Sequence, residues 1–388
     1  MKSELVVAAS VLAVLATAGG AAAHEPAAPG GPIEAIEQGR LRLDLRYRLE
    51  SVDDDAFAKD ALASTLRSAL SFESAGWRGL FAGFTIENVS AIGNDLLYNN
   101  SGAGSRGNGV TDRPVVADPE ISEFDEIYLG YRGPGGLELK AGRFAYTLDN
   151  QRFIGIAPWR QNHRSYTGAS LALALPAGFD ASYAFLDRAF YNNGASFGLS
   201  AHLLHLSRDL GFADAAAYGY LIDWDDEPRE GLSSATVGAR LDGSTALRVF
   251  DVLYLAEYAR QSDYGENPQD FGLDYIHLVL GARKGAWSLR AGWELKDGNG
   301  TTAVQTPLGT NHGLNGFADK LVVTPPGGSH DRFLRLSFDR ERWAWLLAYH
   351  DFEAAVGSAR FGTEIDFQGR FTPAPSLSFF LKVAHYRA

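Results

Sequence analysis

Arginines that recur at every second position are the residues of this sequence with the clearest chemical potential. In LRLDLRYRL, residues 41–49, Arg42, Arg46 and Arg48 share one side with Asp44, while leucines and one tyrosine occupy the other side. A guanidinium group stays charged and offers several N–H donors in a fixed fork, so it pairs well with carboxylates. This series predicts recognition of anions.

Other charged residues fall at equivalent positions of similar segments. The further arginines expected on the polar face are Arg67, Arg240, Arg290, Arg335 and Arg370. Acids are expected there in nearly equal number: Asp44, Glu50, Glu87, Glu126, Glu138, Glu257, Glu294, Glu364 and Asp366. Two interpretations stay open for each arginine, because it can contact a solute or brace the protein by pairing with one of these acids.

No group of residues has the pattern of a catalytic or metal centre. His202 and His205 are three residues apart, a spacing that sends them to opposite faces of a strand. The chain has no cysteine, and it contains no zinc signature, phosphate-binding loop or nucleophile elbow. We expect no enzyme activity, no cofactor and no metal. The net charge of −12 argues against nucleic-acid binding.

The elements that carry these residues are strands, because side chains alternate between two faces only in a strand. The alternation of 41–49 returns at 287–295 and 361–371. Strands of about ten residues, aromatic residues near their ends, and short turns that alternate with long polar loops are typical of a transmembrane β-barrel. They favour this fold over a soluble sandwich. We expect one set of side chains to face the lumen, namely Arg42, Asp44, Arg290, Glu294, Glu364 and Arg370. A second set is expected to face lipid, namely Leu43, Leu45, Trp293 and Phe367.

The N-terminus predicts export. Lys2 precedes an apolar run over 5–16, and Ala21-Ala22-Ala23 supplies small residues for cleavage. We therefore expect a signal peptide over 1–23, a periplasmic lead-in over 24–40, and one barrel domain over 41–388. The predicted location is the bacterial outer membrane, with its lipid and lipopolysaccharide as neighbours.

The strand count is odd. The pattern predicts seventeen strands, at 41–52, 62–73, 80–89, 124–132, 137–144, 169–175, 179–186, 196–206, 213–224, 233–242, 249–261, 274–283, 286–296, 332–339, 343–352, 360–371 and 377–386. Barrels of this kind have an even number of strands, because both chain ends lie in the periplasm. We expect that a closing strand is missing: either the natural chain continues past Ala388, or the barrel has a gap or a strained seam beside 41–52.

Two stretches resemble the alginate-export porin family. The first is GRFAYTLDNQRFIGIAPWRQN at 142–162, and the second is HGLNGFADKLVVTPPGGSHD at 312–331. GTEIDF at 362–367 and KVAHYRA at 382–388 are similar to the family's last strands. Phe144 and the pair Gly328-Ser329 depart from the family's usual residues.

The resemblance implies a barrel of about eighteen strands with an arginine-lined lumen that passes an anionic sugar polymer. It adds site residues from the two motifs: Arg143, Asp149, Arg152 and Arg160 from the first, and Asp319 and Lys320, as a pair, from the second. It also implies periplasmic export partners.

Four functional hypotheses remain at this point. The first is a passive pore for anionic saccharides or an alginate-like polysaccharide. The second is a general or small-carboxylate porin on the same fold. An outer-membrane enzyme would need a Ser/His pair at the lipid-facing edge, which the sequence does not offer. An adhesin or structural barrel would have a lumen filled by side chains.

Overall fold

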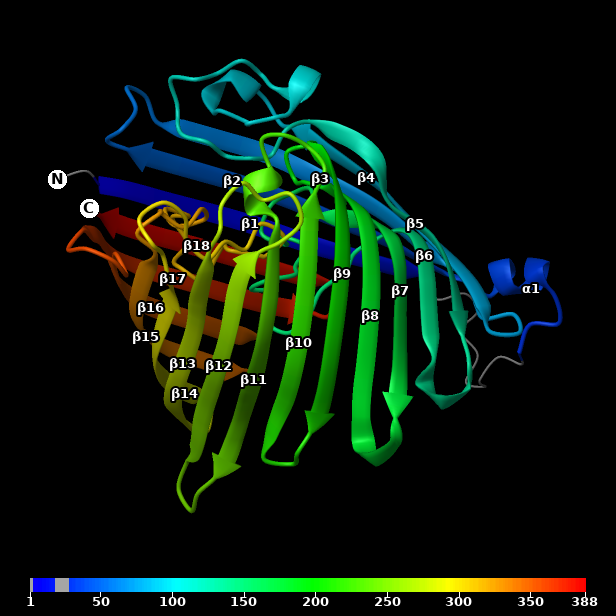
Figure 1. The fold of residues 1–388 in the computed structure, drawn as a ribbon. Coiled ribbons are helices and arrows are strands. Elements are labelled where there is room, and N and C mark those ends of the chain that lie inside the picture. Colours follow the sequence, from blue (N-terminus) through cyan, green and yellow to red (C-terminus); the bar gives the residue numbers. More distant parts are fainter. Residues whose placement is uncertain (1–2, 18–27) are drawn as a thin grey trace.

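The computed structural model describes residues 3–17 and 28–388 as one antiparallel sheet of eighteen strands that closes on itself. Each strand pairs with its neighbours in sequence, and β1 pairs with both β2 and β18. Figure 1 shows β1 and β18 side by side, with the two chain ends together. The predicted all-β barrel is confirmed.

The strands are β1 (Ser3–Thr17), β2 (Arg40–Asp54), β3 (Ala61–Glu73), β4 (Leu80–Ala91), β5 (Ile121–Arg132), β6 (Glu138–Phe144), β7 (Ser165–Leu175), β8 (Phe179–Phe190), β9 (Ser196–Asp209), β10 (Ala213–Trp224), β11 (Ser234–Ala246), β12 (Asp251–Asp263), β13 (Gly272–Lys284), β14 (Trp287–Lys296), β15 (Ser329–Arg340), β16 (Trp343–Glu353), β17 (Arg360–Ala374) and β18 (Leu377–Arg387). One short helix, α1 (Pro32–Glu37), precedes β2. Five 3-10 turns lie in the connections: η1 (Asp95–Leu97), η2 (Gly104–Arg106), η3 (Pro134–Gly136), η4 (Pro176–Gly178) and η5 (Glu230–Leu232).

The wall has an apolar outer face and a charged inner face. Leu129, Val237 and Leu280 are 70%, 61% and 65% exposed on the outer face, whereas Glu87 and Glu294 on the inner face are buried. Exposed apolar side chains at such density suit contact with lipid. Among the described residues, no helix has the length and hydropathy needed to span a membrane.

All seventeen predicted strands are present, but the expectation of a gap is wrong. Ser3–Thr17 fills the position between β18 and β2, where Val7 lies opposite Val383 on one side and Ser51 on the other. This segment escaped the strand count because both of its faces are largely apolar, so it lacks the two-sided pattern of the other strands. Its assignment to a signal peptide stays a prediction, and the cleavage point after Ala23 lies outside the described residues.

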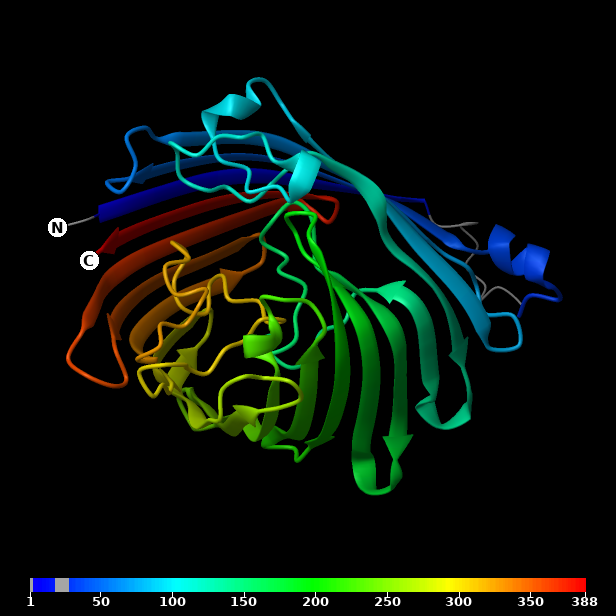
Figure 2. The ribbon, with the colours of Figure 1, turned by 45° about the horizontal axis from the view of Figure 1, so that its top comes forward.

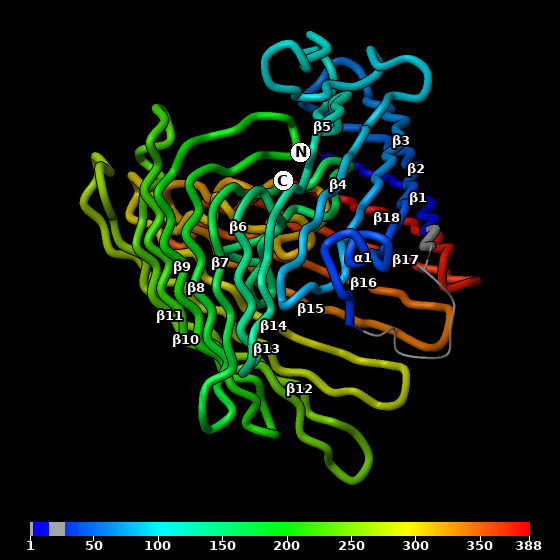
Figure 3. The backbone as a smooth tube through the Cα atoms, turned by 90° about the vertical axis from the view of Figure 1, so that its right-hand side faces the viewer, coloured from blue at the N-terminus to red at the C-terminus, as the bar shows by residue number. Residues whose placement is uncertain are grey.

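The two rims of the barrel differ. One rim, which we call the long-loop rim, carries the connections 92–120, 145–164 and 297–328. The other carries short turns, and α1 lies beside it (Figure 3). The ends of β1 and β18 near Ser3 and Arg387 lie together at the long-loop rim.

Two of the long connections fold into the barrel. We call 145–164 the first inward loop and 297–328 the second inward loop. Figure 2 shows them inside the ring of strands. Both bond to side chains of the inner wall: Gln161 of the first bonds to Thr65, and Asn315 of the second bonds to Glu294. The two loops thus occupy part of the lumen.

The mass of the mature protein tests the prediction about the N-terminus. The three alanines before His24 predict a mature chain that begins there, whereas closure of the sheet through β1 requires that Ser3–Thr17 be retained. Intact-mass spectrometry and N-terminal sequencing measure this directly. Protein that retains Lys2 and the residues after it would contradict the signal peptide and keep β1 in the wall.

Candidate functional site

The two inward loops bond to each other inside the barrel, and we call this part of the lumen the constriction. The amide of Gly155 donates to the carbonyl of Leu308 at 2.8 Å, and that of Thr310 donates to the carbonyl of Gln151 at 2.7 Å. Gln151 has a φ of 63°, in the left-handed region that L-residues seldom adopt. Such backbone persists only where the surroundings hold it, so this junction is tightly determined.

An aromatic cluster fixes the first inward loop against the wall. Phe153 inserts among inward-facing tyrosines, with its ring centroid 5.1 Å from that of Tyr275 and 5.7 Å from that of Tyr218. The hydroxyl of Tyr166 donates to the carbonyls of Gly155 and Leu308. These contacts hold the first inward loop against β10, β13 and β7.

Arg152 anchors the same loop through a buried ion pair. Its Nη2 lies 2.6 Å from Oε2 of Glu294 on β14, and both side chains are almost fully buried. Tyr275 donates to the other carboxylate oxygen at 2.8 Å. Burial by itself lowers the pKa of Arg152, but Glu294 and Tyr275 together outweigh this effect and raise it, so the guanidinium stays charged. Arg152 is held too firmly to be a contact for a passing solute.

Two arginines of β2 hold the middle of the first inward loop. Arg46 donates to the carbonyl of Pro158 at 3.0 Å and to the side chain of Gln161 at 2.7 Å. Arg48 donates to the carbonyl of Trp159, pairs with Asp118, and lies 3.3 Å from Glu50. These arginines, singled out in the sequence for anion recognition, also position the loop.

A stack of rings lies at the centre of the constriction. The ring of Trp159 lies parallel to that of His312, with 4.7 Å between centroids. His312 Nδ1 lies 3.0 Å from Asp319, and its Nε2 lies 2.8 Å from Nζ of Lys382 on β18. Because an ammonium only donates, Nε2 accepts, and the neutral ring carries its proton on Nδ1. Burial is the main reason that the pKa of His312 falls to about 4.

Two cavities flank this stack. The outer cavity, toward the long-loop rim, has a volume of about 530 Å³, and the inner cavity has a volume of about 470 Å³. Trp159, Thr310 and His312 line both cavities. These three residues therefore form the partition between the two halves of the path.

Cationic side chains predominate in both cavities. The inner cavity is lined by Arg42, Arg46, Arg67 and Lys382 against a single carboxylate, that of Asp44. The outer cavity has four cations, Arg160, Arg164, Arg229 and Lys320, against three carboxylates, Glu4, Asp54 and Asp319. The path is therefore positive on both sides of the partition, although the chain as a whole is acidic.

Three of these cations were not among the residues predicted from the sequence. Arg164 and Arg229 have no acidic partner among the described residues and lie over the ring of Tyr191, at 4.4 and 4.6 Å from its centroid. Lys382 contacts rings, with Nζ 4.0 Å from the centroid of Trp159. Alternation along 377–386 places Lys382 on the inner face, but nothing in the sequence marks Arg164 or Arg229.

The other predicted arginines lie mostly in ion pairs of the wall. Arg67 pairs with Glu87, and Arg42 with Asp44; the remaining pairs are Arg143 with Glu123, Arg240 with Glu257 and Asp242, and Arg370 with Asp339. Arg335 donates to the carbonyls of Gly313 and Leu314 of the second inward loop. Arg290 is exposed in a further cavity of about 370 Å³ that Arg240 and Arg335 also line.

Charged residues of the two motif loops form ion pairs that differ from the pair predicted from the sequence. Asp319 and Lys320 do not pair with each other: Arg160 bridges Asp319 and Glu50 at 3.3 and 3.4 Å, and Lys320 pairs with Glu4 and, at 2.8 Å, with Asp54. The backbone turns at Asp319, whose φ is 58°, and the two charges are bonded to different parts of the structure. In the first motif, Asp149 pairs with His205 of β9 at 3.0 Å.

Replacing Arg152 tests the buried ion pair. We expect Arg152→Ala to lower the free energy of unfolding by about 3–5 kcal/mol, because Glu294 would keep a buried charge without its partner. Arg42→Ala is the control, since its side chain is 56% exposed and its pair with Asp44 contributes at most about 1 kcal/mol. Urea unfolding in lipid vesicles measures both. Equal losses would show that Arg152 is not an anchor.

The protonation of His312 gives a second test. Its folded pKa of about 4 lies below the ordinary value of 6.5, so the neutral ring stabilises the fold above pH 6.5 and this contribution is lost as the pH falls toward 4. We expect the wild type to lose more stability than His312→Gln between pH 7 and pH 4.5. The glutamine variant reports the pH dependence that comes from neighbouring acids alone, so the difference between the two proteins isolates His312. If the stabilities of both proteins fall in parallel with pH, the assignment of a lowered pKa to His312 is contradicted.

Comparisons with known proteins agree with this architecture. Residues 38–188 match the family model described as alginate export, and no curated protein matches the chain. Similar solved structures include OccAB2 of Acinetobacter baumannii, at 12% identity and a TM-score of 0.65, and OpdK of Pseudomonas aeruginosa with vanillate, at 9% and 0.67. In both, 99% of this chain and 97% of the other are covered. The resemblance to the alginate-export family is thus confirmed over residues 38–188, and the chain has the fold of outer-membrane β-barrels of the porin type.

Proposed function

We propose that the chain is a passive pore for anionic saccharides, including an alginate-like polysaccharide, and that it carries out no chemical step. One observation carries this proposal: the inner cavity sets four cationic side chains against one carboxylate. A fixed excess of positive charge in a narrow aqueous path attracts anions and repels cations.

The arrangement along the path supports a substrate with repeated carboxylates. Arg229 and Arg164 lie in the outer cavity, and Lys382 and Arg46 lie in the inner cavity beyond Trp159. A carboxylate that dissociates from one cation can bind to the next cation along the path, while water solvates the sugar hydroxyls. Binding that is shared among several weak positions attracts a solute without trapping it.

A small-carboxylate porin is the second candidate. The partition formed by Trp159, Thr310 and His312 divides the path into two cavities, each of a size that suits a small molecule. OpdK, which shares this fold, was solved with vanillate. Blocking by uronate oligomers of increasing length separates the two candidates, because only a polymer pore gains affinity with each added unit.

The partners follow from the same proposal. The apolar outer band would contact membrane lipid and lipopolysaccharide, with residues such as Leu129 and Leu280 at the lipid face. Periplasmic export partners would meet the rim of short turns. Neither proposal includes nucleic acid, since the chain has a net charge of −12.

Block of single-channel current by a hexauronate tests the proposed substrate class. We expect Arg229→Gln and Lys382→Gln each to weaken block about tenfold or more, because a hydrogen bond to a charged group contributes about 1.5–3 kcal/mol. Lys59→Gln is the matched control, since Lys59 is an exposed cation that pairs with Asp112 outside both cavities.

The outcomes of this test are distinct. Weaker block in both cavity variants, with normal block in Lys59→Gln, supports the proposed path. Unchanged block in all three folded variants would exclude these cations as the anion path and leave the pore without the proposed selectivity.

A further inference from the structure

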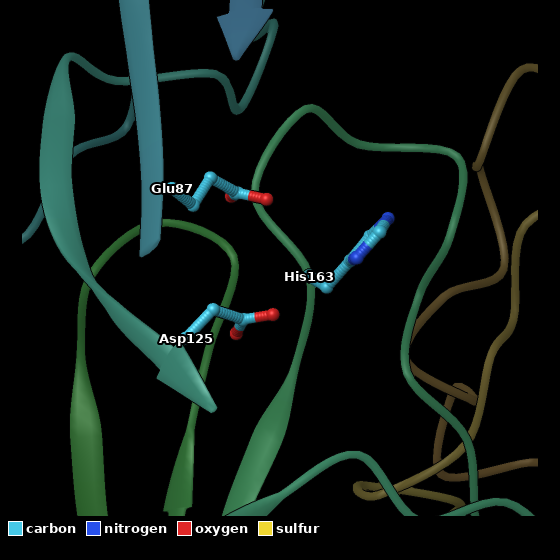
Figure 4. A group of neighbouring side chains, drawn as sticks. All are labelled: Glu87, Asp125 and His163. Carbon is cyan, nitrogen blue, oxygen red and sulfur yellow. The ribbon is translucent and has the colours of Figure 1, made fainter. Parts of the chain in front are cut away.

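Three side chains from separate elements converge at the inner wall beside the first inward loop. Glu87 comes from β4, Asp125 from β5, and His163 from the first inward loop, and Figure 4 shows the carboxylates directed toward the imidazole. One ligand atom of each residue lies within 4.8 Å of those of the other two. No other group of three or more such residues was found in the described part of the chain.

Irregular backbone brings Asp125 into this group. The pairing of β4 with β5 shifts register between Thr85 and Ile86, which leaves Asp125 as the extra residue of a β-bulge. A bulge redirects a side chain that regular alternation would place elsewhere. Asp125 therefore lies on the same inner side as Glu126, and only 2% of it is exposed.

The carboxylates have oxygens without partners. Glu87 is fully buried, and its Oε1 has no hydrogen-bond partner among the described residues; the same is true of Oδ1 of Asp125. Within residues 3–17 and 28–388, the His163 ring likewise has no hydrogen-bond partner. A buried carboxylate oxygen without a donor is costly, so this group needs a cation or a shared proton.

The neighbouring arginines occupy other positions. Arg67 donates to Oε2 of Glu87, which leaves Oε1 free. Arg143 pairs with Glu123 at 3.2 Å, and its Nη2 remains 3.9 Å from Oδ1 of Asp125. Arg67 and Arg143 each keep a carboxylate partner, while Oε1 of Glu87 and Oδ1 of Asp125 stay without a hydrogen bond among the described residues.

We propose that Glu87, Asp125 and His163 bind a divalent transition metal of the zinc type. Two carboxylate oxygens and one imidazole nitrogen are a common donor set for Zn²⁺, with water as the fourth ligand. An imidazole ligand favours a transition metal over Ca²⁺ or Mg²⁺, because these two ions prefer oxygen ligands. The sequence contains no metal-binding motif and predicts no metal. The three ligands escape such a prediction because only the fold brings them together.

The metal would join the first inward loop to the wall. Asn162 already donates to Glu123, and Gln161 donates to Thr65, so the loop is bonded to β5 and β3 on the residues just before His163. A metal on His163 adds a link to β4 and β5 at the end of the loop. Because His163 also lines the inner cavity, occupancy would stabilise the constriction at the edge of the proposed path.

Zinc titration of the refolded, tag-free barrel tests the site. We expect isothermal titration calorimetry to show one Zn²⁺ per chain, with affinity reduced about tenfold or more in His163→Ala and in Asp125→Asn. His205→Ala is the matched control, because it removes a half-buried lumen histidine that pairs with Asp149. Zn²⁺ should also raise the unfolding temperature of the wild type and of His205→Ala, but not of His163→Ala.

Two outcomes would overturn the proposal. Absence of stoichiometric Zn²⁺ binding, or equal affinity in the wild type and His163→Ala, would mean that Glu87 and Asp125 share a proton and that His163 is not a ligand. Binding of Ca²⁺ as strong as that of Zn²⁺, unchanged in His163→Ala, would exclude the imidazole and with it a site of the zinc type.

Discussion

The pairing of backbone groups in a medium without water is the constraint on which the rest of the structure depends. Each unpaired N–H or C=O in hydrocarbon costs several kcal/mol, so a sheet in a membrane must close. Here the closure runs through Ser3–Thr17, which pairs along its length with β2 and β18. Closure gives every strand one face toward lipid and one toward the lumen, and this division places the charged residues together inside.

A lumen full of charges must pair most of them, and the pairing creates the constriction. Arg46, Arg48 and Arg152 bond to the first inward loop or join it to the wall, and Arg335 bonds to the second. The cavity cations that remain for a solute are those without a salt bridge among the described residues, such as Arg164, Arg229 and Lys382. Anion selectivity therefore comes from cations that lack an acidic partner. The ion pairs hold the loops in the positions that keep these cations accessible.

The sequence predicts the wall far better than the site. Alternation such as that of 41–49 reports a local property, the two faces of a strand, and it located seventeen strands. Ser3–Thr17 lacks that alternation, and nothing local shows that it pairs with β2 and β18. In the site, the first motif contains Arg152 and Arg160, but their partners Glu294 and Asp319 lie far along the chain. Ion pairing and burial depend on such distant contacts, so the sequence could not separate anchoring arginines from free ones.

The zero-current potential of the wild-type pore in a salt gradient tests the central claim most directly. A planar bilayer with tenfold more KCl on one side reports the ratio of anion to cation permeability. The measurement needs neither a blocking oligosaccharide nor a variant of the protein. If the path is cationic, chloride should pass more readily than potassium, and the zero-current potential should have the sign of an anion-selective pore. Its magnitude should fall as the ionic strength rises, because salt screens the fixed charges. A cation-selective pore, or a well-folded barrel that carries no current, would contradict the account.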